Sequence, residues 1–396
     1  MKKPVETVAP FKEVIAEIKQ AGGTAVRHCY QCGKCDVVCP WNRVRDFSMR
    51  KVIREASFGL TEIESEDLWR CTTCGTCPAE CPRGVKQIEI GVSLRRIASS
   101  YDVFPASVKA ARTARGSLLA DGNPLTEDRA KRADWARGLP VRPFVEGMDY
   151  LYFVGCYFSY DPRLKKVAAA TANILDRAGV DFGILGARES CCGESIRKTG
   201  AEDVWKTLAR ENIKTFIDGG VKKILVSSPH CYHTFKNEYP ELMVKFEVVH
   251  ISQLLLELIE TGRLELTREV GKKVTYHDPC YLGRHNGIYD EPRAVLRRVP
   301  GLELREMTDS RQQSLCCGGG GGRIWMDTPK SERFSNLRVE QARETGAEVL
   351  VTSCPYCISN FEESRLTLEY EDVLEVKDLT EVVWEAMGGD VPSSGI

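Results

Sequence analysis

Cysteine spacing is the feature of this sequence that most constrains its fold. The chain has 396 residues and 17 cysteines, and every cysteine belongs to one of four groups. The first two groups share one internal spacing and lie 42 residues apart, and the other two repeat at offsets of 124 to 126 residues. Two separate duplications therefore divide the chain. The groups are Cys29, Cys32, Cys35, Cys39; Cys71, Cys74, Cys77, Cys81; Cys156, Cys191, Cys192, Cys231; and Cys280, Cys316, Cys317, Cys354, Cys357.

Composition and charge exclude several classes of protein. Secreted disulfide scaffolds are short and carry a signal peptide, whereas residues 1–20 are studded with charges. No run of 18 apolar residues occurs, so we expect no membrane span. The net charge of −1 argues against nucleic acid as a partner. We therefore expect the cysteines to serve metal or redox chemistry in a reducing, cytoplasmic compartment.

The first two groups follow the spacing C-x2-C-x2-C-x3-C-P, which matches the bacterial two-cluster ferredoxin run. Three cysteines of such a run bind one cube, and the fourth crosses to the partner cube. The alternative is a pair of zinc sites, which need no fourth cysteine in each run. The spacing therefore predicts two [4Fe–4S] cubanes that carry electrons, one on Cys29, Cys32, Cys35 and Cys81, the other on Cys71, Cys74, Cys77 and Cys39.

Hydrophobic periodicity predicts a mixed α+β and α/β chain. Helices are expected at 11–20, 48–58 and 85–100, and after residue 148 short β-branched runs alternate with helix-length stretches. Such alternation predicts parallel strands with the cysteines at their carboxyl ends. The expected strands are 150–154, 223–226, 273–276 and 348–352, and the expected helices are 165–178, 202–217, 252–261 and 331–345. The expected domains are an α-helical two-cluster ferredoxin-like domain (1–115), a linker (116–148) and two repeated α/β cysteine-rich domains (149–265 and 266–396).

Adjacent cysteines followed by glycine mark the second duplication. Neighbouring thiolates do not easily bind one tetrahedral ion together, but they can bridge fused iron–sulfur units, and the fourth group supplies five thiolates. The glycine run that follows Cys317 lets the backbone approach a bulky group and turn its N–H groups toward sulfur. We therefore expect cofactor contacts from Gly318, Gly319 and Gly320.

The pattern C-x35-CCG-x35-C-P-x-C resembles the cysteine-rich domain of heterodisulfide reductases. The strings that carry the resemblance are HDPCYLGR at 277–284, CCGGGGGR at 316–323 and SCPYC at 353–357. Essentially the whole chain resembles a ferredoxin-type subunit fused to the catalytic cysteine-rich subunit. It is also similar to the iron–sulfur proteins of electron-transfer-flavoprotein:menaquinone oxidoreductases and of membrane complexes in sulfate reducers.

This resemblance implies an oxidoreductase of anaerobic metabolism with a non-cubane [4Fe–4S] cluster in the second cysteine-rich domain. In heterodisulfide reductases such a cluster takes the sulfurs of a disulfide onto iron, and electrons from the cubanes cleave the S–S bond in one-electron steps. The catalytic cysteines implied in this way are Cys280, Cys316, Cys317, Cys354 and Cys357.

The third group departs from this pattern because Ser228 stands where the second repeat has Cys354. Four thiolates remain, which leaves open a further iron–sulfur cluster, a zinc ion or a structural site, with His230 and His233 as candidate nitrogen ligands. The four are Cys156, Cys191, Cys192 and Cys231.

Polar residues near the second set of motifs add weaker expectations. His277 and Asp278 are expected to hydrogen-bond the ligand loop. His285 is a candidate for acid–base work, and Arg323 is a candidate for holding a substrate carboxylate or phosphate.

No nucleotide- or flavin-binding signature is present in the sequence, so electrons are expected to come through a flavoprotein or a membrane cytochrome b-like subunit. The expected function is disulfide/thiol interconversion within a heterodisulfide-reductase-like complex. The expected location of this complex is the cytoplasm or the inner face of the membrane, where a partner subunit would hold it. One alternative is a pure electron-transfer subunit, which links a flavoprotein or acyl-CoA redox enzyme to a quinone-reactive membrane subunit or serves a large aryl-CoA reductase. Another is a zinc-bearing structural protein.

Overall fold

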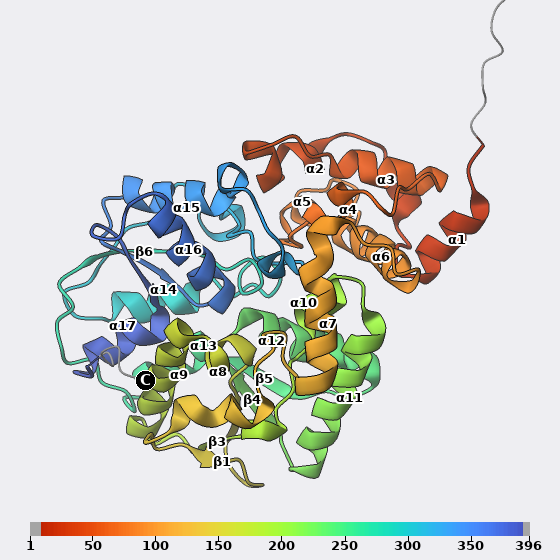
Figure 1. The fold of residues 1–396 in the computed structure, drawn as a ribbon. Helices are drawn as coiled ribbons and strands as arrows, with labels where there is room; N and C mark the ends of the chain where they lie inside the picture. The colour runs from red at the N-terminus through yellow and green to blue at the C-terminus, as the bar shows by residue number, and fades with distance from the viewer. Residues whose placement is uncertain (1–8, 391–396) are drawn as a thin grey trace, which may run out of the picture.

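The computed structural model describes residues 9–390, and its N-terminal part is a small helical domain at one end of the molecule (Figure 1). Its helices pack around the cysteine loops through apolar residues such as Ile18 and Ile53. The helices expected at 11–20, 48–58 and 85–100 are confirmed within two residues at each end. The helices are α1 (Lys12–Gln20), α2 (Lys34–Val37), α3 (Met49–Phe58), α4 (Glu66–Arg70), α5 (Thr76–Ala79) and α6 (Gln87–Ser100).

Two parallel sheets follow, one in each copy of the second duplication. The first has the order β1-β3-β2-β4-β5 and the second β7-β6-β8-β9, so four strands of the first sheet repeat the order of the second. All four expected strands are confirmed. The bounds are β1 (Arg142–Pro143), β2 (Tyr150–Phe153), β3 (Phe182–Ile184), β4 (Lys223–Val226), β5 (Glu247–His250), β6 (Lys273–Tyr276), β7 (Glu303–Leu304), β8 (Val349–Thr352) and β9 (Glu375–Asp378).

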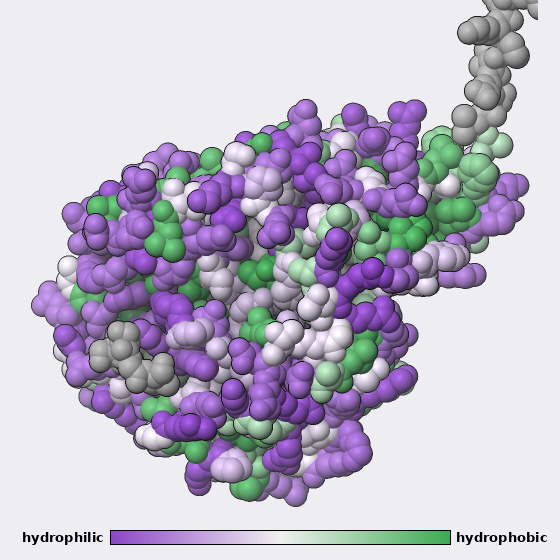
Figure 2. Space-filling model, viewed as in Figure 1, coloured by the Kyte–Doolittle hydropathy of each residue, from purple (hydrophilic) through white to green (hydrophobic). Residues whose placement is uncertain are grey.

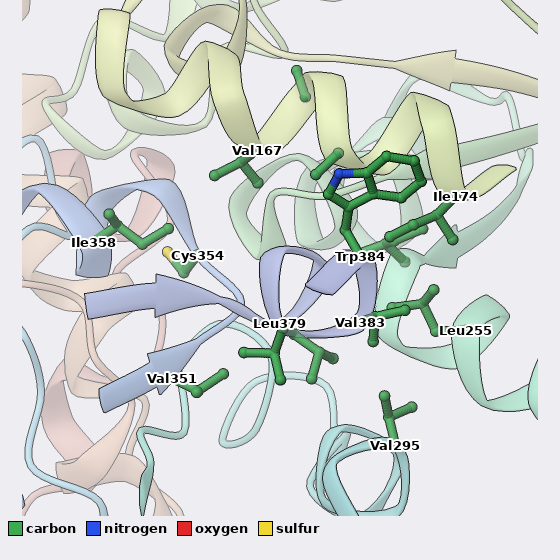
Figure 3. Packing of buried hydrophobic residues seen from close by; sticks show 14 of the residues in the cluster. Val167, Ile174, Leu255, Val295, Val351, Cys354, Ile358, Leu379, Val383 and Trp384 are labelled. Atoms are coloured by element: carbon green, nitrogen blue, oxygen red, sulfur yellow. The ribbon is translucent and has the colours of Figure 1, made fainter. Parts of the chain in front are cut away.

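Helices cover both sheets and join them into one core. Helix α9 of the first α/β domain packs against α17 of the second, and Figure 3 shows Val167 and Ile174 of α9 facing Trp384. The two α/β domains therefore share a hydrophobic interior. Their helices are α8 (Cys156–Tyr160), α9 (Pro162–Arg177), α10 (Glu194–Lys198), α11 (Glu202–Asp218), α12 (Pro229–His233), α13 (Ile251–Glu260), α14 (Asp290–Arg297), α15 (Phe334–Glu344), α16 (Pro355–Thr367) and α17 (Leu379–Ala386).

The segment 116–148, which the sequence suggests as a linker, packs along the first α/β domain. It contains the end of α7 (Lys109–Asp121), a 3-10 helix (Arg129–Ala136) and strand β1. Trp135 is buried, and the buried Arg132 guanidinium lies 2.6 Å from the carboxylate of Glu189. Glycine, proline and charge predict turns, but they do not show whether the turns pack against a core.

The surface is mostly hydrophilic (Figure 2). A group of hydrophobic side chains is visible where α1 and α3 meet. Phe11 and Phe58 are exposed near these helices, and the Phe11 N–H donates to the Phe58 carbonyl over 2.9 Å. Of the helices in residues 9–390, none has the length and apolar character needed to cross a membrane.

Candidate metal centres

The thiols expected to bind the first cubane share one small cavity. Cys29, Cys32 and Cys35 come from the loop and short helix before residue 37, and Cys81 joins them from the loop after α5. Arg50 and Gln87 also line this cavity. Burial, followed by the neighbouring Asp36, raises the pKa of the Cys35 thiol to about 12.

The thiols expected to bind the second cubane lie deeper in the protein. Burial raises the pKa of Cys77, and the nearby thiols of Cys71, Cys74 and Cys39 raise it further. The Thr73 backbone N–H donates to Cys71 Sγ over 3.4 Å. The fourth cysteine of the first run therefore lies beside the three leading cysteines of the second run.

Five thiols meet at the carboxyl edge of the second sheet. Cys280 follows β6, Cys354 precedes the first residue of α16, Cys357 lies in the first turn of that helix, and Cys316 and Cys317 follow β7. All five are buried. The Gly318 N–H donates to Cys316 Sγ over 3.4 Å. Burial raises the pKa of Cys354, but hydrogen bonds from Cys357 and His230 outweigh burial and lower that pKa to about 5.

His277 and Asp278 hydrogen-bond the residues around these thiols, as expected. Arg338 Nε donates to His277 Nδ1 over 3.0 Å, so the proton of the neutral imidazole is on Nε2, which lies 3.4 Å from Cys357 Sγ. Burial lowers the pKa of His277 well below its ordinary value, which keeps the ring neutral. The carboxylate of Asp278 is bound by Arg293 at 2.6 Å and accepts the Arg311 N–H at 2.7 Å, which fixes the loop before Cys316.

The five-thiol set lies directly against the helical domain. A contact between the thiols of Cys74 and Cys316 raises the pKa of Cys74, and Thr72 Oγ1 lies 3.8 Å from Cys316 Sγ. Arg284 joins the two parts because its Nε donates to the Cys74 carbonyl over 2.8 Å.

The glycine run has two kinds of neighbour. The N–H groups of Gly318 and Gly319 bond the thiols of Cys316 and Cys317. Gly320 instead packs on the loop of the second cubane motif, where a Cβ would lie 2.3 Å from the Thr72 carbonyl oxygen. The close approach at Gly320 is therefore to protein backbone.

The four thiols of the first repeat also share a cavity, together with Ser228 and His230. Cys231 Sγ lies 3.4 Å from Cys192 Sγ, and Arg132 Nη2 lies 3.4 Å from Cys156 Sγ. His233 lies elsewhere, in a cavity of about 480 Å³ that Tyr281 and His285 also line. Of the two candidate nitrogen ligands, only His230 borders the first-repeat thiols.

His285 and Arg323 line different cavities. Burial lowers the pKa of His285 to about 3, and its Nε2 lies 2.8 Å from the Thr73 carbonyl oxygen. A separate cavity of about 310 Å³ reaches Cys317 and Gly318 and contains Arg323, Trp41 and Asn360.

Arg323 is a buried cation with no paired carboxylate among the residues that the structure describes. Its guanidinium lies over the Trp41 ring at 5.4 Å and donates to the Asp327 carbonyl and the Thr328 hydroxyl. The side chain is 7% exposed, and its Nε has no hydrogen-bond partner. Burial, followed by the charge of Arg95, lowers its pKa to about 10.

Several buried residues at these sites carry no sequence signal. Arg338 and Glu194 bind groups that are distant in sequence, and no motif marks them. Arg284 is the last residue of the string at 277–284, but the sequence does not show that it binds the Cys74 carbonyl. Within residues 9–390, no three His, Cys, Asp or Glu side chains converge as the ligands of a single metal ion would.

Comparison with known proteins matches both kinds of motif. Residues 25–85 match the family described as 4Fe-4S dicluster domain, and residues 150–236 and 274–362 match the Cysteine-rich domain. The chain is 32% identical over 391 residues to one of the subunits of the dihydromethanophenazine:CoB–CoM heterodisulfide reductase of Methanosarcina barkeri, covering 91% of this chain and 93% of that protein.

Two further relatives differ in how much they share with this chain. EtfAB:quinone oxidoreductase of Syntrophomonas wolfei is 36% identical over 348 residues, or 84% of this chain and 48% of that protein, so the chain spans about half of its length. Among solved structures, a hypothetical protein from Helicobacter pylori aligns with a TM-score of 0.55 at 11% identity, over 96% of this chain and 73% of that one. That likeness shows the fold alone.

Proposed function

Because the chain belongs to the heterodisulfide reductase family of iron–sulfur oxidoreductase subunits, we propose that it passes electrons between two cubane clusters and a non-cubane [4Fe–4S] cluster for disulfide/thiol interconversion. The observation that carries this proposal is the packing of the five-thiol set on the loop of the second cubane motif, where Thr72 Oγ1 lies 3.8 Å from Cys316 Sγ and Arg284 Nε donates to the Cys74 carbonyl over 2.8 Å. This packing brings the second cubane set close to the five-thiol set, and electrons transfer rapidly only over short distances.

The side chains present fit such clusters. Each proposed ligand set offers four or five thiols, and backbone N–H groups donate to their sulfurs at Cys71 and Cys316. Sulfur hydrogen bonds and burial are the features that tune iron–sulfur potentials. When bound, the clusters supply one-electron transfer and soft-metal affinity for the sulfurs of a disulfide.

The protein's own side chains position the cysteines and bind the substrate. His277 hydrogen-bonds Cys357, and Arg284 places a cation beside Cys74 and Cys316. The cavity beside Cys317 is proposed to admit the disulfide, with Arg323 binding an anionic group of it. Cleavage of one S–S bond takes two electrons, which a partner redox protein supplies one at a time, and two protons from solvent, and it releases two thiols.

Iron content tests the cluster assignment. The anaerobically purified chain is expected to hold about twelve irons or more, since two cubanes account for eight. Cys317→Ser is expected to remove about four irons, those of the cluster on the five-thiol set. Cys77→Ser is expected to remove about four other irons, those of the second cubane. A wild-type chain with about eight irons or fewer would contradict the non-cubane cluster.

A second function, pure electron transfer, is favoured by the similarity to EtfAB:quinone oxidoreductase. In that case the chain would link a flavoprotein, or an acyl-CoA or aryl-CoA redox enzyme, to a quinone-reactive or cytochrome b-like membrane subunit at the inner face of the membrane. Adding a thiol to the oxidised protein distinguishes the two functions. A disulfide reductase is expected to give a new paramagnetic signal, whereas a relay is expected to give none.

The first repeat is tested by a separate measurement, because its four thiols leave open a cluster, a zinc ion or a structural site. Cys192→Ser is the counterpart of Cys317→Ser in this repeat. Loss of iron in Cys192→Ser would indicate a cluster, and loss of zinc would indicate a zinc ion. No loss of metal would indicate a structural site.

A further inference from the structure

Arg338, in helix α15, is a fully buried cation near the five-thiol set. Its terminal nitrogens donate to neutral acceptors: Nη1 donates to the Asp309 carbonyl over 2.7 Å and to Gln341 Oε1 over 2.8 Å, and Nη2 donates to Ser314 Oγ over 3.1 Å. Among the residues that the structure describes, no carboxylate forms an ion pair with it. Burying a charge costs free energy unless other groups compensate, so the fourth contact of this guanidinium, made by Nε, is the one to explain.

The Nε–H of Arg338 fixes the tautomer of His277. Arg338 Nε donates to His277 Nδ1 over 3.0 Å. A guanidinium can donate but cannot accept, so Nδ1 carries the lone pair and the single proton of the ring lies on Nε2. His277 Nε2 lies 3.4 Å from Cys357 Sγ, at hydrogen-bonding distance for sulfur. The arginine therefore directs an N–H at one thiol of the five-thiol set.

The His277 ring is held against the helix that carries Cys357. The backbone N–H of His277 donates to the Val351 carbonyl over 2.8 Å, which ties the residue to strand β8. Phe361, one turn after Cys357 in α16, meets the ring edge to face at 4.7 Å between ring centroids. His277 is buried, so water does not compete for its polar atoms. The sheet and the helix place the ring, and Arg338 selects the nitrogen that carries the proton.

The first repeat does not have this arrangement. Phe153 stands at the position of His277, three residues before the first cysteine of its repeat. Its ring packs edge to face on Phe216 and Phe235 in an apolar cluster. The same fold therefore accepts an apolar ring at this position, and packing alone does not require a histidine bound by a buried arginine. The histidine occurs in the repeat that has five thiols.

We propose that Arg338 is a positioning residue that acts through His277: it keeps the Nε2–H directed at Cys357 and thereby stabilises the reduced form of the cluster on the five-thiol set. The inference rests on the proposed function because it requires that cluster. A hydrogen bond to a ligand sulfur favours the more negative, reduced state, and so it raises the reduction potential. Without the donor from Arg338, the ring can carry its proton on Nδ1 and leave the sulfur without this hydrogen bond.

A redox titration followed by electron paramagnetic resonance tests this inference on the full chain with its clusters. The component that belongs to the five-thiol set is the one that Cys317→Ser removes. Arg338→Lys keeps a cation but has a methylene where arginine has Nε, whereas Arg338→Gln loses the charge but keeps an N–H at that place. We expect Arg338→Lys to lower the equilibrium ratio of reduced to oxidised cluster about tenfold, a midpoint shift of about 59 mV to more negative potential for a one-electron step. Arg338→Gln is expected to shift the midpoint less.

His277→Phe tests whether the arginine acts through the histidine, and it introduces the residue that the first repeat has at this position. It is expected to lower the midpoint by a similar amount, because the sulfur loses the same donor. Arg338→Lys added to His277→Phe is expected to shift the midpoint little further, since two residues of one hydrogen-bond network do not act additively. Arg343→Met is the matched control, because Arg343 lies in the same helix but donates to the Val373 carbonyl instead. Its midpoint is expected to equal that of the wild type.

An unchanged midpoint in Arg338→Lys, a shift at least as large in Arg338→Gln or in Arg343→Met, or an equal further shift when Arg338→Lys is added to His277→Phe overturns the inference. If Arg338→Lys does not assemble its clusters, Arg338→Gln must keep a midpoint closer to that of the wild type than His277→Phe does, and the reverse order overturns the inference. A wild-type chain without any component that Cys317→Ser removes contradicts the proposed function itself, and this inference with it.

Discussion

Gly320 shows how a single residue sets the distance between two sites. Its backbone lies so close to the loop of the second cubane motif that a Cβ would be 2.3 Å from the Thr72 carbonyl oxygen. A Cβ at the neighbouring Gly321 would lie 2.4 Å from the Cys71 carbonyl oxygen, and the φ of Gly321 is +64°, which an L residue rarely adopts. Both glycines are required by the approach of two domains.

Substitution Gly320→Ala is expected to destabilise the protein by about 1–3 kcal/mol, because one loop must move to relieve the overlap. Denaturant unfolding of the cluster-loaded protein measures the loss, and iron analysis shows whether the second cubane motif still assembles.

Gly116→Ala is the matched control for this substitution. A Cβ at Gly116 meets no atom within 4 Å, and the residue lies inside helix α7. Alanine there is expected to raise stability by up to about 1 kcal/mol, since glycine is a poor helix former. Equal stability changes in the two variants would contradict the packing argument.

At the scale of elements, helix α17 begins after Asp378, a capping residue whose carboxyl is buried. Asp378 accepts the Thr380 N–H at 2.9 Å and the Thr380 hydroxyl at 2.8 Å through Oδ1, while Oδ2 is buried without a partner. Burial raises the pKa of Asp378 to about 7. The folded state therefore prefers the protonated carboxyl.

This preference predicts a pH dependence of stability. The unfolded aspartate has a pKa of about 3.9, so the folded state binds one more proton than the unfolded state between that pH and about 7. The contribution of Asp378 to stability is complete below about pH 4 and decreases as pH rises to about 7, by an amount on the order of 4 kcal/mol.

Asp378→Asn is expected to remove that decrease, because the amide keeps an oxygen acceptor for Thr380 and does not titrate. The free energies of unfolding at pH 5 and pH 8, compared between wild type and variant, measure the effect. Asp161→Asn, at the half-buried N-cap of α9, serves as control. A slope that persists in Asp378→Asn would show that other groups cause it.

At the scale of the whole molecule, Arg95 of α6 connects all three domains. Its guanidinium donates to the carbonyls of Leu68 and Cys71 in the helical domain, of Lys198 in the first α/β domain and of Gly321 in the second. The side chain is 1% exposed. One cation therefore fixes the second cubane loop against both repeats.

Arg95→Leu is expected to destabilise the molecule by about 3–5 kcal/mol, because buried carbonyls lose charged donors. It is also expected to slow reduction of the cluster proposed on the five-thiol set, since the second cubane loop is no longer held against that set. Denaturant unfolding and stopped-flow reduction measure the two effects. Arg137→Leu, which removes a surface ion pair with Asp134 at the end of a 3-10 helix, is expected to change stability by less than about 0.5 kcal/mol.

Much of this architecture is a local property of the sequence. The strands at 223–226 and 273–276 and the helix expected at 252–261 between them follow from short-range patterns, whereas the short helix α12 is not among the helices expected. Sequence alternation implies parallel sheets with the cysteines at one edge. Cysteine spacing likewise identifies the iron–sulfur motifs, because three thiolates of one short loop reach a cluster with little help from the rest of the chain.

Tertiary structure decided what lies between those motifs. The burial of the supposed linker, the contact of Thr72 with Cys316 and the hydrogen bond from Arg284 to the Cys74 carbonyl join segments that are distant in sequence. Such contacts depend on how domain surfaces pack, and periodicity carries no information about that. The sequence by itself determined which residues offer sulfur, and only the packing of three domains decided which sets of thiols lie close together and which side chains hold their loops.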